Sequence, residues 1–172
     1  MKDVADIFWN QVLENIDIES FIDVGTGENG VVGMHDIDKK KVKRKYSIDI
    51  YSIKPLPHEW NTIIMDARHI LKKFGEKSID IIQACDFLEH LSKEDGLKWL
   101  QDCEKMARKA ILIFTPVGLV ESPSAGLHPE NIYQKHLSGW TYEEFEKLGY
   151  KTGKDMEDNL WKSSNIVAWK VL

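Results

Sequence analysis

The sequence has few cysteines and no long hydrophobic run. Its two cysteines, Cys85 and Cys103, are far apart and form neither a C-x-x-C pair nor a zinc-like spacing, so we expect reduced thiols. No apolar stretch is long enough to cross a bilayer, so we expect no membrane span. Residues 1–6 are polar and acidic where a secretory signal peptide has a basic start and an apolar centre. We therefore expect an intracellular, cytoplasmic protein.

Internal repeats, low-complexity tracts and an excess of positive charge are absent as well. The net charge of -5 disfavours a general nucleic-acid binder. Six of the seven residues in 39–45 are nevertheless basic. Such a run is typical of a solvated helix end, where cations complement the helix dipole. A local patch for RNA or an anionic substrate is the alternative interpretation.

The remaining pattern fits one α/β domain, residues 1–172. Apolar periodicity predicts strands at 18–24, 46–51, 61–65, 78–85, 110–115, 150–153 and 165–171. It predicts helices at 3–16, 31–37, 69–74, 92–109 and 141–148. This alternation predicts a Rossmann-like, doubly wound, mostly parallel seven-stranded sheet with an antiparallel C-terminal strand. The ligand crevice of such a sheet lies at the carboxyl ends of its strands.

Three glycines follow the first strand within six positions, Gly25, Gly27 and Gly30. They indicate a turn where the backbone approaches a ligand closely, and they match the G-x-G-x-x-G pattern of dinucleotide oxidoreductases. Against that reading, Asp23 would place a carboxylate near a pyrophosphate. Residues 31–33 are also a poor start for the long helix whose N-terminus would bind the phosphates. A dinucleotide enzyme is therefore a weaker alternative.

Residues 23–27, Asp-Val-Gly-Thr-Gly, resemble the first motif of class I S-adenosylmethionine-dependent methyltransferases, acid-x-Gly-x-Gly. Three further segments match in the order of that family: Asp49 at the end of the second strand, residues 66–67 after the third, and residues 78–91 along the fourth. A fifth, residues 136–150, resembles the segment before the penultimate strand in ubiquinone-biosynthesis-like methyltransferases. The resemblance implies S-adenosylmethionine as cofactor.

The family's cofactor contacts can be transferred to matching positions. The resemblance implies that Asp49 accepts hydrogen bonds from both ribose hydroxyls, and that Asp66 and the Ala67 backbone hold the adenine edge. Carboxylates suit this cofactor, because it carries hydroxyls and an amine and has no phosphate. The alternative roles are a strand-end turn residue for Asp49 and a helix N-cap for Asp66.

The first motif itself would contact the methionine side of the cofactor. The resemblance implies that Gly25 and Gly27 pass close against it, since glycine permits such an approach. Asp23 would orient the turn or reach the methionine amine through water.

Methyl transfer needs alignment of the acceptor, and a dedicated base is optional because the sulfonium supplies the reactivity. Candidate catalytic residues are Asp86, His90 and His136, with Glu89 and His128 also considered. The alternative is a structural role: a polar first turn for Glu89 and His90, and a ring packed under a loop for His136. We expect no metal, because the fifth strand ends at 114–116 without the carboxylates of catechol-type methyltransferases.

The Asn-Pro-Pro-Tyr signature of amino-directed DNA and protein methyltransferases is absent, which favours a small-molecule acceptor, including a lipid or sugar precursor. Residues 1–17, as an N-terminal helix, and a substrate-side loop at 117–139 would form the acceptor pocket. A partner chain or a homodimer would complete it. Two alternatives stay open: a catalytically inert binding or regulatory module with this fold, and an RNA methyltransferase that uses residues 39–45.

Overall fold

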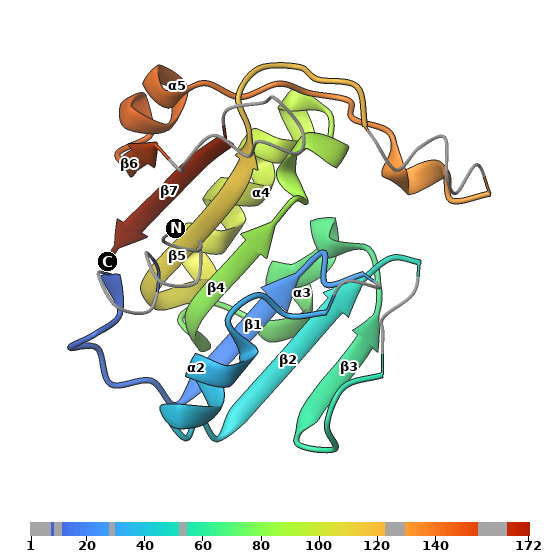
Figure 1. Cartoon of the computed structure of the whole chain (residues 1–172). Coiled ribbons are helices and arrows are strands. Elements are labelled where there is room, and N and C mark those ends of the chain that lie inside the picture. The colour runs from blue at the N-terminus through green and yellow to red at the C-terminus, as the bar shows by residue number, and fades with distance from the viewer. Residues whose placement is uncertain (1–7, 9–11, 28–29, 52–54, 123–129, 155–164) are drawn as a thin grey trace.

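The computed structural model describes residues 8, 12–27, 30–51, 55–122, 130–154 and 165–172. These residues form one seven-stranded sheet with the strand order β3-β2-β1-β4-β5-β7-β6 (Figure 1). The strands are β1 (Ser20–Val24), β2 (Arg44–Asp49), β3 (Trp60–Ile64), β4 (Ile79–Cys85), β5 (Ala107–Pro116), β6 (Lys151–Lys154) and β7 (Asn165–Val171). Strands β1 to β5 pair in parallel, whereas β7 is antiparallel to both β5 and β6. The predicted α/β sheet is confirmed.

Short helices follow most of the parallel strands. They are α2 (Met34–Lys39), α3 (Ile70–Phe74), α4 (Lys93–Met106) and α5 (Tyr142–Lys147), with 3-10 turns η2 (Ala67–His69), η3 (Leu88–His90) and η4 (Ile132–Gln134). The caps fix where the longer helices start: Ser92 accepts a hydrogen bond from the backbone of Asp95, and Thr141 forms a capping box with Glu144. The helix predicted at 3–16 lies mostly outside the described residues.

The sheet is covered on both faces, which explains why apolar residues dominate its central strands. One face packs against α3, α4 and α5 around Trp99, Met106 and Phe145. The other packs against α2 and N-terminal residues that include Phe8. Every residue of β1 and nearly all of β4 are buried. The core therefore lies on both sides of β1, β4 and β5, and their carboxyl ends stay fixed in position.

Several predicted boundaries differ from the structure by two or three residues, and two of these differences lie beside ion pairs. Helix α4 ends at Met106 and β5 begins at Ala107, three residues earlier than predicted. The early start places Arg108 Nε 2.8 Å from the fully buried carboxylate of Asp80. The basic run is likewise not one helix end, because its last two residues belong to β2 and Lys45 is buried against Asp38 at 2.7 Å.

Two further sequence expectations concern the membrane and the cysteines. Among the helices built from described residues, none is long and apolar enough to cross a membrane. Cys103 is buried in the core, where burial raises the pKa of its thiol, and no disulfide joins it to Cys85 in the described residues.

Candidate functional site

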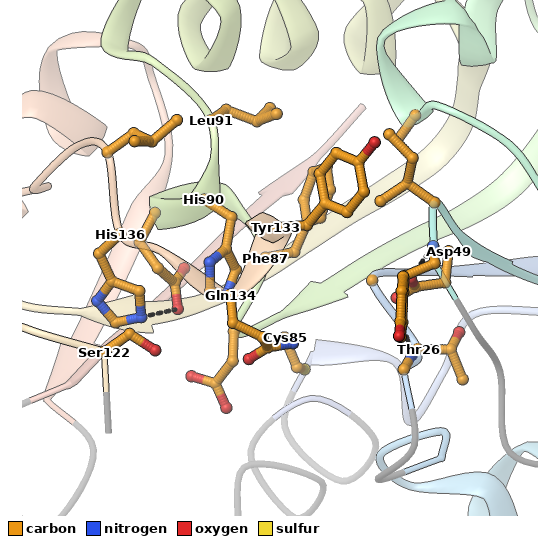
Figure 2. A pocket seen from close by; sticks show the side chains of 18 of the residues that line it. Thr26, Asp49, Cys85, Phe87, His90, Leu91, Ser122, Tyr133, Gln134 and His136 are labelled. Atoms are coloured by element: carbon orange, nitrogen blue, oxygen red, sulfur yellow. Dashed lines mark hydrogen bonds and ion pairs between the residues drawn. The ribbon is translucent and has the colours of Figure 1, made fainter. Parts of the chain in front are cut away.

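The carboxyl ends of the parallel strands open into a cavity of about 830 Å³, which is the size of a small-molecule site. The structure brings all nine predicted site residues to its wall: Asp23, Gly25, Gly27, Asp49, Asp66, Ala67, Asp86, His90 and His136. Figure 2 shows two ends of this cavity, with Thr26 and Asp49 at one and His90 and His136 at the other. His128 lies outside the described residues.

The turn after β1 depends on glycine at two positions. Gly25 has a φ of 77°, and a Cβ added there would lie 2.7 Å from Cβ of Phe87. Gly27 has a φ of 52° and faces the carboxylate of Asp49. The backbone N–H groups of Gly25 and Thr26 both donate to the carbonyl of Ile48, at 2.8 and 3.2 Å. The turn is therefore fixed to the end of β2 by its main chain.

Asp49 holds the same turn from its side chain. Its Oδ2 accepts a hydrogen bond from the backbone N–H of Gly27 at 3.0 Å, and its Oδ1 accepts one from Tyr51 at 2.8 Å. A carboxylate has about four acceptor positions, so each oxygen keeps capacity for another donor. Asp49 thus has a fixed orientation at the cavity wall and can still accept two hydroxyl groups.

Asp23 is buried beneath the turn, with 3% of its surface exposed. Its Oδ2 accepts a hydrogen bond from Thr26 Oγ1 at 2.7 Å, and its Oδ1 accepts one from Gln83 Nε2 at 2.9 Å. Burial raises its pKa to about 7, although both hydrogen bonds oppose that shift, and the charge of Asp49 adds to it. Asp23 therefore supports the turn through its hydrogen bond with Thr26, and its role toward a cofactor stays a prediction.

Sequence reasoning missed Thr26 and Gln83. The available signal for Gln83 was a polar side chain inside the apolar run of β4, which a buried strand contains only when a partner satisfies it. Thr26 lies between two glycines and has the only hydroxyl in the turn from 25 to 27.

Asp66 takes the N-cap role that the sequence left as an alternative. Its Oδ1 accepts a hydrogen bond from the backbone N–H of Arg68 at 2.9 Å, at the start of η2. The guanidinium of Arg68 also binds it, with Nη2 at 2.6 Å from Oδ2, and these contacts lower the pKa of Asp66. Arg68 reaches Asp95 as well, at 3.2 Å. An adenine amino group would therefore share the Asp66 carboxylate with Arg68, a residue that the motif comparison did not include.

The second end of the cavity is formed by η3 and the loop before α5. Glu89 is 2% exposed, and its Oε2 accepts a hydrogen bond from Thr115 Oγ1 at 2.8 Å. Burial raises the pKa of Glu89 to about 8, and the negative charge of Asp86 adds to the shift. Asp86 itself is exposed and has a φ of 48°, a left-handed conformation that aspartate adopts more readily than most residues.

The two histidines face this carboxylate. Nε2 of His136 lies 4.0 Å from Oε1 of Glu89, and the ring centroids of His90 and His136 are 4.9 Å apart (Figure 2). Burial lowers the pKa of both rings, that of His90 to about 4. Ligand atoms of Glu89, His90 and His136 all lie within 4.8 Å of one another, a grouping that can hold a metal ion. The His136 ring also packs under the loop, which is the structural role that we considered as the alternative.

No protein-family model matches the sequence, and no curated protein is similar to it. Solved structures do share its fold. The 1,6-didemethyltoxoflavin-N1-methyltransferase of Burkholderia thailandensis, crystallised with 1,6-didemethyltoxoflavin and S-adenosylhomocysteine, superposes with a TM-score of 0.70 at 10% identity, over 99% of this chain and 78% of that chain. A SAM-dependent methyltransferase of Archaeoglobus fulgidus gives a TM-score of 0.62 at 17% identity, over 96% and 94%.

The magnesium protoporphyrin IX methyltransferase of Synechocystis PCC 6803, with bound S-adenosylhomocysteine, gives a TM-score of 0.58 at 12% identity, over 97% of this chain and 81% of that chain. Other matched proteins are much longer: the chain covers 56% of one from Nostoc punctiforme and 24% of the small RNA methyltransferase HEN1. At such identities the shared property is the Rossmann-like fold of SAM-dependent methyltransferases.

Proposed function

We propose that this chain is an S-adenosylmethionine-dependent methyltransferase acting on a small molecule, a class that includes lipid and sugar precursors. The observation that carries the proposal is the joint geometry of Gly27 and Asp49. A glycine turn with positive φ lies directly against a carboxylate that keeps acceptor capacity toward the cavity. Such an arrangement suits a ligand with a vicinal diol and no phosphate.

The rest of the cavity supports a cofactor in this orientation. Asp66 and Ala67 lie one strand further along the sheet, where an adenine would follow a ribose held by Asp49. Asp23 under the turn would attract the cationic methionine amine, and the charge of that amine would in turn favour the ionised form of the Asp23 carboxylate. Helix α2 begins at Met34, well after the glycine turn, and its N-terminus is capped by Gly33 without a side-chain hydrogen bond. A pyrophosphate would lack the helix N-terminus that dinucleotide sites provide.

The acceptor would bind at the histidine end. Residues of the 117–139 loop, among them Val120, Ser122 and His136, line that part of the cavity. Methyl transfer is an in-line displacement, so the protein aligns the acceptor and removes its proton where necessary. The candidate residues for accepting that proton are Asp86, His90 and His136, which line this end of the cavity. The finer likeness to ubiquinone-biosynthesis-like methyltransferases rests on residues 136–150, and His136 of that segment lies at this same end.

An RNA acceptor receives less support. Lysines of the basic run have partners within the described residues: Lys39 with Asp36, Lys40 with the carbonyls of Leu13 and Glu14, Lys43 with Glu19, and Lys45 with Asp38. The run also ends at the amino end of β2, whereas the cavity lies at the carboxyl end, roughly 17 Å away along the strand. The placement favours a structural role for these residues.

Calorimetric titration with S-adenosylhomocysteine, with NADH as the control ligand, tests the proposal. We expect micromolar binding of S-adenosylhomocysteine and none of NADH. Binding of NADH alone would replace the proposal with the dinucleotide enzyme, and binding of neither would favour the inert module. Turnover with candidate acceptors then separates an enzyme from a module that only binds the cofactor.

A further inference from the structure

We infer that Glu89, His90 and His136 bind one divalent first-row transition-metal ion, and that this ion holds the oxygen atom of the methyl acceptor. The first half of the inference concerns this chain alone, and the second rests on the proposed function. Two imidazoles and one carboxylate form a ligand set that suits zinc, iron and cobalt, and three protein ligands leave coordination positions open for a substrate. Their ligand atoms already lie within 4.8 Å of one another.

The hydrogen bonds of the two rings prepare both histidines as ligands. Nδ1 of His90 lies 3.2 Å from the carbonyl oxygen of Lys135, and Nδ1 of His136 lies 2.8 Å from that of Val120. A carbonyl oxygen only accepts, so each Nδ1 carries the hydrogen and each neutral ring keeps its lone pair on Nε2. Metal-binding histidines typically have this support, in which the second ring nitrogen donates to a carbonyl or carboxylate.

Glu89 is supported in the same way and lacks a partner on the side that faces the histidines. Thr115 Oγ1 fixes Oε2, whereas Oε1 is buried without a hydrogen-bond partner among the described residues. A buried polar atom with no partner is rare in folded proteins, because it loses its hydration without compensation. In the described part of the chain, the basic side chain within 4.0 Å of Oε1 is that of His136. A cation between these groups would satisfy Oε1.

The backbone holds the three ligands together although 46 residues separate His90 from His136 in the sequence. The carbonyl of Glu89 accepts hydrogen bonds from the N–H groups of Leu137 at 2.7 Å and Ser138 at 3.1 Å. These bonds attach the segment that carries His136 to the turn that carries Glu89 and His90. Tetrahedral coordination would bring the ligand atoms to about 3.3 Å from one another, a closure that side-chain rotation can provide.

We expected no metal from the sequence, because the fifth strand ends without a carboxylate. The structure supplies one from η3, since Glu89 reaches Thr115 near the end of β5. An acceptor hydroxyl on the ion would lose its proton more readily to solvent. Its oxygen would then bond to the methyl carbon as the carbon–sulfur bond breaks and S-adenosylhomocysteine leaves. Because Nε2 of His136 has one lone pair, this role excludes His136 as the direct base.

The test is a calorimetric titration of the EDTA-treated, dialysed protein with Zn²⁺, repeated with Co²⁺ while the visible absorption of Co²⁺ is recorded. We expect one ion per chain and an absorption change that reports nitrogen and oxygen ligands. Glu89→Gln, His90→Gln and His136→Gln should each weaken binding about tenfold or more. His69→Gln is the matched control, because His69 is exposed on η2 outside the cluster and should bind the ion as the unchanged chain does.

Equal Zn²⁺ affinity in the three cluster variants and in His69→Gln would mean binding to surface histidines only and would overturn the inference. So would the absence of any Zn²⁺ or Co²⁺ binding by the unchanged chain, a result that does not depend on whether a variant folds. Titration of the same samples with S-adenosylhomocysteine keeps the two proposals apart. Cofactor binding without metal binding defeats this inference alone, and metal binding without cofactor binding defeats the methyltransferase proposal and the acceptor role, while the metal site stands.

Discussion

The carboxylate of Asp49 accepts a hydrogen bond from the backbone N–H of Gly27 at 3.0 Å, so the residue that ends β2 holds the turn that ends β1. The two residues are 22 positions apart, and the parallel pairing of β1 with β2 brings them together. One side chain therefore shapes the glycine turn and also presents acceptor oxygens to the cavity. Its two tasks can be separated by mutation.

Asp49→Ala should weaken S-adenosylhomocysteine binding by about 1.5–3 kcal/mol, the range for hydrogen bonds to a charged group. The physical reason is the loss of both acceptors for the ribose hydroxyls. Calorimetry gives the affinity, and circular dichroism checks that the variant folds. Asp49→Asn keeps one acceptor for Gly27 and removes the charge, so its loss of affinity should be smaller.

Asp17→Ala is the matched control for the loss of a carboxylate. Asp17 is exposed and precedes β1, so it lies at the amino ends of the parallel strands, whereas the cavity lies at their carboxyl ends. Its removal should leave the affinity unchanged. An Asp49→Ala variant that binds as tightly as Asp17→Ala would defeat the ribose assignment.

Asp23 should make the stability of the protein depend on pH in the opposite sense to most carboxylates. Its pKa is raised from 3.8 to about 7 by burial, so between these pH values the folded chain keeps a proton that the unfolded chain has released. The free energy of unfolding therefore falls as the pH rises through this window, by on the order of 4 kcal/mol at most. Urea denaturation of the ligand-free protein at pH 4.5 and pH 8 measures the change.

Asp23→Asn removes this titration and keeps nearly the same shape. Thr26 and Gln83 can still hydrogen-bond an amide, and Oε1 of Gln83 is buried without a partner in the described residues, so it can accept from the new amide. Relative to this variant, the unchanged protein should be more stable at pH 4.5 than at pH 8. A stability difference that is the same at both pH values would show that Asp23 does not titrate in this window.

Much of the fold was predictable because each central strand is a short apolar run between polar turns. Strands β1, β4 and β5 are mostly buried, so apolar residues dominate them and their approximate positions follow from the sequence. The mostly parallel pairing followed from the alternation with helices, whereas the strand order comes from the structure. The residues at the carboxyl ends of the strands could then be assigned to one cavity.

What could not be predicted depends on contacts between distant side chains. Local periodicity predicted that α4 continues to residue 109, but β5 begins at Ala107 and Arg108 pairs with the distant Asp80. The motif assigned Asp66 to the cofactor, but it does not show that Arg68 also binds this carboxylate. The approach of His136 to Glu89 depends on loop hydrogen bonds that no spacing rule encodes.

Asp80 lies in residues 78–91, the segment along the fourth strand that resembles the methyltransferase family, but its contacts predict a structural role. It is fully buried, and its carboxylate accepts hydrogen bonds from the N–H groups of Glu19 and Ser20, at 2.8 and 3.2 Å, besides the ion pair with Arg108. Asp80→Ala should lower the free energy of unfolding by about 2–4 kcal/mol, since it leaves these donors without their acceptor. Urea denaturation measures this loss, and S-adenosylhomocysteine affinity should not change in the folded variant.

Asp36→Ala is the comparison for a surface ion pair, that of Asp36 with Lys39, and should cost about 1 kcal/mol or less.

The pKa of Asp80 also predicts how its contribution depends on pH. Burial alone would raise the pKa of Asp80, but the donors around its carboxylate hold that pKa below the ordinary 3.8. Its contribution to stability is therefore present above that pH and is lost as the pH falls through the lowered pKa. Reduced cofactor affinity in folded Asp80→Ala would instead assign this residue to the site.

Gly25→Ala should lower the free energy of unfolding by about 2–4 kcal/mol through two effects that a second glycine separates. The first is backbone strain, since alanine rarely adopts a φ of 77°. The second is steric, because the new Cβ would lie 2.7 Å from Cβ of Phe87, whose ring packs on Trp99 with centroids 5.0 Å apart. Phe87 and Trp99 cannot move without disturbing the core, because Trp99 belongs to it and Phe87 packs against it.

Gly75→Ala isolates the backbone effect. Gly75 has a φ of 82°, and a Cβ added there would meet no atom within 4 Å. With a ψ of 173°, Gly75 lies in a backbone region that glycine adopts almost alone, so this variant should lose about 1–3 kcal/mol through backbone strain without a steric contact. Urea denaturation of both variants tests whether Gly25→Ala loses more than backbone strain alone costs. Equal losses would show that the turn at Gly25 can shift away from Phe87, and that close packing against Phe87 is not what requires glycine there.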